Sequence, residues 1–233
     1  MKGKFIIIDG IDGSGKGTIL DSLKNQFKDV FDLREYSKEN KDYPDINNIK
    51  EHIILSSEPT NLYVGAAIRD ELLKGENKYS ALTTAHAFAL DRQILYNKFI
   101  LPALKGGKTI IQERGVVSSL VYQPVQLETL TLRDIMNIQG NSIAIKNSPD
   151  FLIIVKASAE SISSRTKEAK GIFDNLFFQR KIETRFESEW LKQVFERFGS
   201  KVLYLDGNCG LNELKERALK LFKDYIIEGQ TTL

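Results

Sequence analysis

One short stretch near the N-terminus constrains the fold more than any other part of the chain. Residues 4–18 read KFIIIDGIDGSGKGT, an apolar run followed by a glycine-rich turn, and an amphipathic segment follows at once. Strand, loop and helix in this order make G-x-x-x-x-G-K a phosphate cradle, because backbone N–H groups, the positive helix end and a lysine converge. The pattern predicts that a nucleoside triphosphate binds at Gly10, Asp12, Gly13, Ser14, Gly15, Lys16, Gly17 and Thr18.

The residue after the lysine departs from the commonest form of this loop. A Ser or Thr usually follows the lysine and holds Mg²⁺, whereas this chain has Gly17 there and Thr18 one place later. We therefore expect the metal to sit mainly on phosphates, water and nearby carboxylates. The run Gly-Lys-Gly-Thr resembles the loop of adenylate-kinase-type nucleoside monophosphate kinases. The alternative is a glycine-rich turn that binds nothing.

Length and composition limit the class of protein. A chain of 233 residues with 42% hydrophobic and 27% charged residues predicts one α/β domain over 1–233. A net charge of +2 does not suggest a nucleic-acid-binding surface. The single Cys209 excludes an intramolecular disulfide framework and a zinc cluster, so we expect a reducing, cytoplasmic setting. No apolar run approaches the length of a membrane span, and the N-terminal run is too short for a signal peptide.

Short apolar runs alternate with helical patterns along the chain. This alternation predicts a central five-stranded parallel sheet flanked by helices on both sides. The expected strands are 5–8, 53–55, 109–111, 151–155 and 202–205. The expected helices are 17–27, 65–73, 81–104, 118–122, 130–138, 159–166, 176–198 and 211–227. Two stretches do not fit this rhythm: residues 34–51 are polar and predict an exposed insertion, and residues 124–149 are long and mixed.

Further short motifs follow the loop, and with the loop included the pattern spans residue 5 to about residue 205. They are Ser57-Glu58-Pro59-Thr60 with Ile68-Arg69; Phe88-Ala89-Leu90-Asp91-Arg92; Gln112-Glu113-Arg114 with Ser118-Ser119 and Tyr122-Gln123; and Pro149-Asp150 with Arg165 and 167–175. In order and approximate spacing they resemble the R-E-P, F-x-x-x-R, D-R-Y, S-x-x-A-Y-Q and P-D-L elements of thymidylate kinases. Each motif is weak alone, but five in the right order form a strong signal.

The resemblance implies a three-layer P-loop nucleoside monophosphate kinase fold and transfer of the γ-phosphoryl group of ATP to dTMP. The catalytic residues it implies are Lys16, Arg114 and Arg165, with a lid at about 166–176. Arg114 would hold the acceptor phosphate, and lid cations would cover the migrating group. The family also implies Mg²⁺ as cofactor and a homodimer.

The resemblance also implies a dTMP site of Asp12, Arg69, Phe88, Arg92, Arg114, Ser119 and Tyr122. Phe88 would stack on the base, and Arg92, one helical turn on, would donate to O4 of thymine. Tyr122 would crowd the sugar 2′ position, and Ser119 would bond the base edge. The plainer alternative is that Phe88 is core and Arg92 is solvated.

Two departures from the family pattern bear on the chemistry. Ser57 stands where the family usually has arginine, so a phosphate contact would come from Arg69 or from the 34–51 insertion. Asp9 is a methylene shorter and Glu113 a methylene longer than the family's carboxylates, and we expect the pair to compensate around one Mg²⁺. The Glu113-Arg114 pair also fits a deoxynucleoside kinase, with the glutamate as base toward a 5′-hydroxyl. A catalytically weak nucleotide-binding switch or partner protein is the third possibility.

Overall fold

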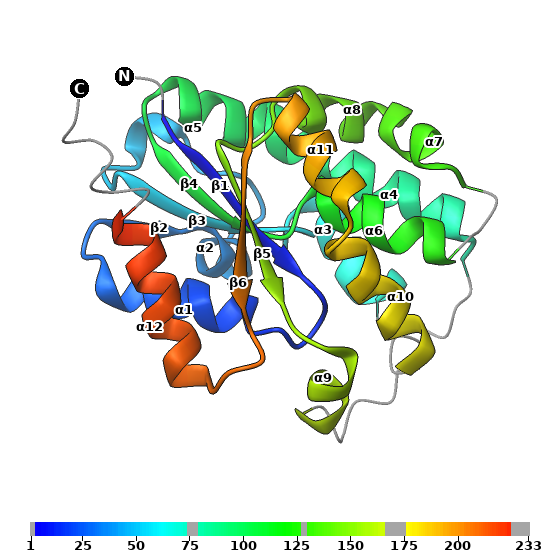
Figure 1. Ribbon diagram of the computed structural model, residues 1–233. Coiled ribbons are helices and arrows are strands. Elements are labelled where there is room, and N and C mark those ends of the chain that lie inside the picture. Colours follow the sequence, from blue (N-terminus) through cyan, green and yellow to red (C-terminus); the bar gives the residue numbers. More distant parts are fainter. Residues whose placement is uncertain (1–2, 74–78, 127–129, 166–175, 225–233) are drawn as a thin grey trace.

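A six-stranded parallel sheet forms the centre of the molecule (Figure 1). The structure, a computed structural model, describes residues 3–73, 79–126, 130–165 and 176–224. The strand order is β2-β3-β4-β1-β5-β6, and every neighbouring pair is parallel. The strands are β1 (Phe5–Gly10), β2 (Val30–Asp32), β3 (Ile53–Ser57), β4 (Thr109–Glu113), β5 (Phe151–Lys156) and β6 (Lys201–Asp206). The predicted open parallel sheet is confirmed.

The sheet has one strand more than the sequence predicted. The missed strand, β2, has only three residues and pairs with β3 at the edge of the sheet. A run this short carries no periodicity, so only its pairing with β3 defines it as a strand.

Helices cover both faces of the sheet and make the three layers visible in Figure 1. On one face α1 (Lys16–Gln26) and α12 (Leu211–Phe222) pack against the strands through a cluster that includes Leu20, Leu23 and Phe222. The other face carries α4 (Ala81–Leu95), α6 (Val116–Gln126), α8 (Gln139–Lys146), α10 (Leu176–Phe186) and α11 (Glu189–Arg197). No described helix is long and apolar enough to cross a membrane.

The remaining helices are short. They are α2 (Leu33–Glu39), α3 (Tyr63–Ala67), α5 (Leu101–Lys105), α7 (Leu132–Asn137) and α9 (Ala159–Arg165), with single turns η1 (Ile46–Asn48), η2 (Ile68–Leu72) and η3 (Tyr96–Ile100). The long helix expected over 81–104 is present as α4, η3 and α5 in direct succession. The helix expected over 176–198 is divided into α10 and α11, because Ser188 takes an extended conformation and begins α11.

Residues 34–51 are not simply an exposed excursion. They contain most of α2 and all of η1, and Ile49 is buried in the main hydrophobic cluster. Leu33, the first residue of α2, is also buried there, and Tyr36 and Tyr43 pack against the same cluster. These apolar residues are scattered among polar ones, so their pattern is weak in the sequence. Tertiary packing makes the segment part of the fold.

The parallel arrangement gathers the ends of three strands at one edge. Ile8 of β1 lies opposite Glu113 of β4, and Glu113 lies opposite Ser57 of β3. The segments that follow β1, β3 and β4 therefore start side by side. In open α/β sheets this carboxyl edge is where ligands bind.

The burial of Leu33 leads to a stability prediction. Leu33→Ala should lower the free energy of unfolding by about 2–4 kcal/mol, because it removes buried methyl groups and leaves a cavity. Lys38→Ala, on the exposed side of the same helix, should change it by less than about 0.5 kcal/mol. Urea denaturation followed by circular dichroism measures both. Equal, small effects would mean that α2 does not contribute to the core.

Candidate nucleotide site

The loop between β1 and α1 turns through glycines in conformations that other residues avoid. Gly13 and Gly15 have φ of 79° and 97°. A Cβ at Gly15 would also lie 2.5 Å from Cδ2 of Leu214, so α12 leaves no room for a side chain there. Gly15 begins α1 without any side-chain cap. The loop thus leaves backbone N–H groups at the positive end of α1 for an anion.

Lys16 lies inside this loop and bonds to it. Its side chain is buried, and Nζ donates to the carbonyl oxygens of Gly10 at 2.9 Å and Ile11 at 2.7 Å. Burial lowers the pKa of Lys16, and the negative charges of Asp9 and Glu113 oppose that shift. The Lys16 amine is therefore held at the turn, with the carboxylates of Asp9 and Glu113 nearby.

A cavity of about 780 Å³ opens over the loop. Three segments line it: Asp12, Gly13, Gly15, Lys16, Gly17 and Thr18 of the loop and the start of α1; Glu113 and Arg114 at the end of β4; and the run 208–211 after β6. Eight predicted site residues thus lie around one space. The volume is within the range usual for small-molecule sites.

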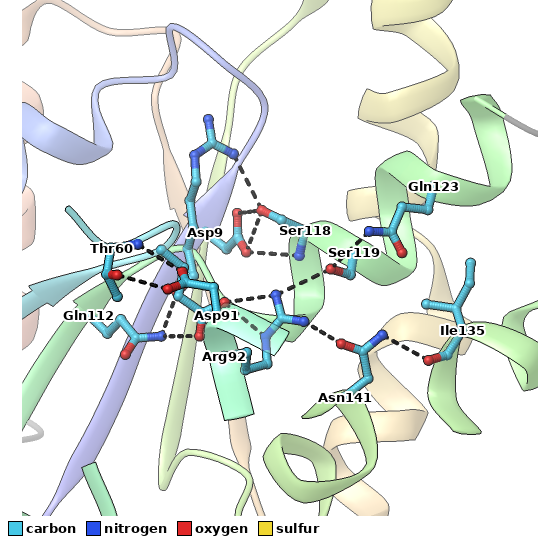
Figure 2. A network of polar contacts seen from close by, with 12 residues as sticks. Asp9, Thr60, Asp91, Arg92, Gln112, Ser118, Ser119, Gln123, Ile135 and Asn141 are labelled. Atoms are coloured by element: carbon cyan, nitrogen blue, oxygen red, sulfur yellow. Dashed lines mark hydrogen bonds and ion pairs between the residues drawn. The ribbon is translucent and has the colours of Figure 1, made fainter. Parts of the chain in front are cut away.

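The two predicted metal carboxylates differ in their surroundings. Asp9 is fully buried, and its oxygens accept from the Gly10 N–H at 2.8 Å and from the Ser118 N–H and hydroxyl at 2.9–3.1 Å (Figure 2). Glu113 lines the cavity, and its Oε2 would be 3.7 Å from a Cβ at Gly17. Burial raises the pKa of both groups, and the charge of Lys16 opposes the rise in each.

Arg114 ties the strand end to the phosphate loop. Its backbone has a φ of 63°, in the left-handed region, and its guanidinium forms an ion pair with Asp12. The same guanidinium donates to the Ser118 hydroxyl at 3.3 Å. Tyr122 completes this group, because its hydroxyl lies 3.2 Å from both the Asp12 N–H and an Asp12 carboxylate oxygen. Burial raises the pKa of Tyr122 to about 12, so its hydroxyl stays protonated at neutral pH.

Arg69 reaches the same edge from η2. Its Nε donates to the carbonyl oxygens of Pro59 at 3.1 Å and Thr60 at 3.0 Å. Burial lowers its pKa, and the charges of Asp91 and Glu113 oppose the shift. Arg69 is therefore close enough to Glu113 to act on it, although it does not line the 780 Å³ cavity.

Arg92 lies at the centre of a buried polar network (Figure 2). Its side chain is only 1% exposed, and its Nη2 is 2.7 Å from Oε2 of Glu58. Further bonds run to Asn141 and to the Ser119 hydroxyl, which also accepts from Gln123. The plainer alternative, in which Arg92 is merely solvated, is therefore wrong. Its charge is compensated inside the protein.

Phe88 and Ser119 flank Arg92 in different ways. Phe88 is half-buried one helical turn before Arg92 and belongs to neither hydrophobic cluster, so it is not a core residue. Ser119 is buried on α6 and accepts from Arg92 at 3.2 Å. Two packed helices, α4 and α6, thus supply an aromatic ring, a guanidinium and a hydroxyl. These groups suit a planar heteroaromatic ligand, which needs a stacking partner and hydrogen-bond partners at its edge.

Two parts of the expected site lie outside what the structure describes. Arg165 is the last residue of α9 and its side chain lies outside the described residues, as do 166–175 of the predicted lid. Conversely, sequence reasoning missed residues 208–211, which line the cavity after β6. Their signal was present, because they follow a predicted strand of the parallel sheet and so start at the same edge.

Comparison with known families adds an independent observation. The family model described as thymidylate kinase matches residues 8–218. The thymidylate kinase of Caldicellulosiruptor saccharolyticus is 30% identical over 231 residues, which cover 97% of this chain and 98% of that protein. The probable thymidylate kinase of Pyrococcus abyssi is 33% identical over 194 residues, 80% of this chain and 82% of that protein.

Solved structures share the fold. A thymidylate kinase from Candida albicans superposes with a TM-score of 0.65 at 18% identity, covering 96% of this chain and 92% of its own. One from Ehrlichia chaffeensis gives 0.64 at 20% identity, covering 95% and 100%. These matches show that the overall fold is the same.

The buried Glu58 leads to a prediction about pH. Burial raises the pKa of Glu58 from its ordinary 4.5 to about 7, although Arg92 opposes the rise. Between these values the folded protein keeps a proton that the unfolded chain has lost, so the unfolding free energy falls as pH rises. Glu58→Gln cannot titrate at this position. Relative to that variant, the unfolding free energy of the parent should fall by on the order of 1–3 kcal/mol between about pH 4.5 and pH 7.

Urea denaturation of both proteins across this window measures that difference. The unfolding free energy of the parent minus that of Glu58→Gln should be highest below about pH 4.5. It should fall as pH rises and become independent of pH above about pH 7. A difference that stays constant with pH would mean that Arg92 keeps Glu58 ionised throughout.

Proposed function

The chain belongs to the thymidylate kinase family, and from this premise we propose that it transfers the γ-phosphoryl group of ATP to dTMP, giving ADP and dTDP. Members of the family are ATP-dependent kinases, and this chain is one of them. One observation carries the assignment to this site: Lys16 of the phosphate loop and Arg114 after β4 line the same cavity. Phosphoryl transfer needs cations that hold the phosphates of the donor and of the acceptor close to each other.

The donor nucleotide binds the loop. Residues Gly10–Thr18 supply backbone N–H groups and the end of α1, and Lys16 exchanges its loop carbonyls for phosphate oxygens. Residues 208–211 form the far wall of the cavity and contact the remainder of ATP. Transfer is in line, so the site acts by positioning and charge neutralisation rather than through a covalent intermediate.

The acceptor nucleotide binds on the other side of Arg114. The Arg114 guanidinium leaves Asp12 to hold the dTMP phosphate, with Arg69 nearby as a second cation. Phe88 stacks on thymine, and Arg92 and Ser119 face its polar edge. Tyr122, bonded to Asp12, crowds the 2′ position of the sugar. Arg165 and the segment 166–176 supply the charge that covers the migrating group.

The donor set at the cavity fits Mg²⁺. Glu113 lines the cavity opposite Gly17, and the absence of a Cβ there leaves space between the carboxylate and the loop. Mg²⁺ prefers oxygen ligands and keeps several waters, so Glu113 and Thr18 with ATP phosphates would hold it, and Asp9 would support the site through Ser118. Within the described residues no group of three metal-ligating His, Cys, Asp or Glu side chains is found. When bound, the ion neutralises phosphate charge.

We also propose a cytoplasmic homodimer. The single Cys209 suits a reducing compartment. Leu82 and Leu90 are 44% and 48% exposed and lie two turns apart on α4, which gives a second copy an apolar face to cover. Sedimentation of the parent and of Leu90→Glu would separate a dimer from a monomer.

The role of Lys16 can be tested directly. Lys16→Met should reduce the turnover number by about 10²–10³, because it removes a preorganised positive charge that stabilises the negative charge of the transferred phosphoryl group. Lys24→Met, a matched change at a half-buried position of the same helix that does not line the cavity, should leave turnover within about twofold. A coupled ADP-release assay gives both rates. Parent-like turnover in folded Lys16→Met would remove the loop from the mechanism.

The acceptor can be identified with a panel of nucleosides and monophosphates. The parent should phosphorylate dTMP and not thymidine, and Arg114→Ala should raise the KM for dTMP at least about tenfold more than that for ATP. Arg197→Ala, at the exposed end of α11, serves as control. Efficient use of thymidine, with loss of activity in Glu113→Gln and little effect of Arg114→Ala, would instead favour a deoxynucleoside kinase. Nucleotide binding without turnover would favour a switch protein.

A further inference from the structure

Helix α8 packs against α4 at Gly140, where no residue other than glycine fits. A Cβ at Gly140 would lie 1.8 Å from the carbonyl oxygen of Ala89 and 2.6 Å from its carbonyl carbon. Any side chain at this position would therefore force the two packed helices apart. Because the backbones touch here, the next residue of α8, Asn141, is carried directly to Arg92, three residues after Ala89 on α4.

Asn141 is held so that only one of its amide ends can face Arg92. The residue is fully buried, and its Nδ2 donates to the carbonyl oxygen of Ile135 at 2.8 Å. Its Oδ1 accepts from Nη1 of Arg92, as Figure 2 shows. A flipped amide would place its NH₂ against a guanidinium, which has donors only. The Ile135 bond therefore fixes Asn141 as an acceptor for Arg92.

The guanidinium then has little freedom left. Of its five N–H groups, the one on Nε bonds Glu58 at 2.8 Å, and the two on Nη2 serve Glu58 and the Ser119 hydroxyl. Nη1 uses one N–H on Asn141. Within the described part of the chain, this leaves a single N–H, on Nη1, for a further acceptor.

We propose that Asn141 is a positioning residue for substrate selection: by holding Nη1 of Arg92, it leaves one oriented N–H for a carbonyl acceptor on a pyrimidine base. The inference rests on the proposed function, in which Arg92 faces the O4 of thymine. A single oriented N–H donates to a keto oxygen but has no lone pair to accept from the 4-amino group of cytosine. Preorganisation lowers the entropic cost of binding, so Asn141 acts on affinity and base choice rather than on phosphoryl transfer.

The decisive variant is Asn141→Leu, which keeps approximate volume and removes the acceptor. We expect the KM for dTMP to rise about tenfold and the preference for dTMP over dCMP to fall by about tenfold. The KM for ATP and the turnover number at saturating dTMP should stay within about twofold. Asn141→Asp, which keeps an acceptor for Nη1, should restore most of the preference.

Asn147→Ala is the matched control. Asn147 closes the same helix and donates from Nδ2 to the carbonyl oxygen of Ile143 at 2.9 Å, but it is exposed and does not contact Arg92. It should leave all kinetic values and the base preference unchanged. A general weakening of α8 would instead affect both asparagine variants alike.

The outcomes separate this inference from the proposed function. A folded Asn141→Leu protein that keeps the parent's KM for dTMP and the parent's preference over dCMP overturns the inference. A parent inactive on dTMP contradicts the proposed function instead.

A measurement on the parent alone decides the inference if the parent is inactive on dTMP or if Asn141→Leu does not fold. In nitrogen-15 spectra without nucleotide, the two Nη1 protons of Arg92 should give separate signals, because the Asn141 bond hinders rotation. A single averaged signal would overturn the inference.

Discussion

The register between β1 and β4 is the constraint on which the rest of the site depends. Because Ile8 lies opposite Glu113, the phosphate loop that follows β1 and the Glu113-Arg114 pair at the end of β4 lie at the same level of the sheet. A shift of one residue would turn Glu113 to the opposite face. Lys16, Glu113 and Arg114 share one cavity only because two parallel strands, over a hundred residues apart, hold this alignment.

The second condition on the site is charge compensation in a place with little water. Asp9, Lys16, Glu58 and Arg92 are each less than 5% exposed, and an isolated charge there would be costly. Every one of them has protein partners: Lys16 uses loop carbonyls, Asp9 uses Ser118, and Glu58 pairs with Arg92. These buried charges therefore have partners within the protein itself. Binding exchanges protein partners for phosphate and base atoms.

The sequence allowed accurate prediction wherever a pattern is local. The apolar run 5–8, the glycine turn and the helix from Lys16 are encoded within some twenty consecutive residues, and the structure has them at nearly those bounds. Prediction failed where an element forms only because of tertiary contacts with residues distant in the sequence. Strand β2 has three residues and needs β3, and the segment 34–51 is ordered by burying Ile49 among distant side chains. Helix α8 depends on the backbone of α4 at Gly140.

Phe88 and Arg92 show where the division lies. The sequence by itself determined that both residues lie one turn apart on one helix, because a 3.6-residue period is a property of the local backbone. It could not determine which N–H of Arg92 remains free. That depends on Glu58 and Asn141, which are 34 and 49 residues away along the chain. Only the tertiary structure brings a carboxylate and an amide to one guanidinium, since hydrogen bonds are decided by distances of about 3 Å in space.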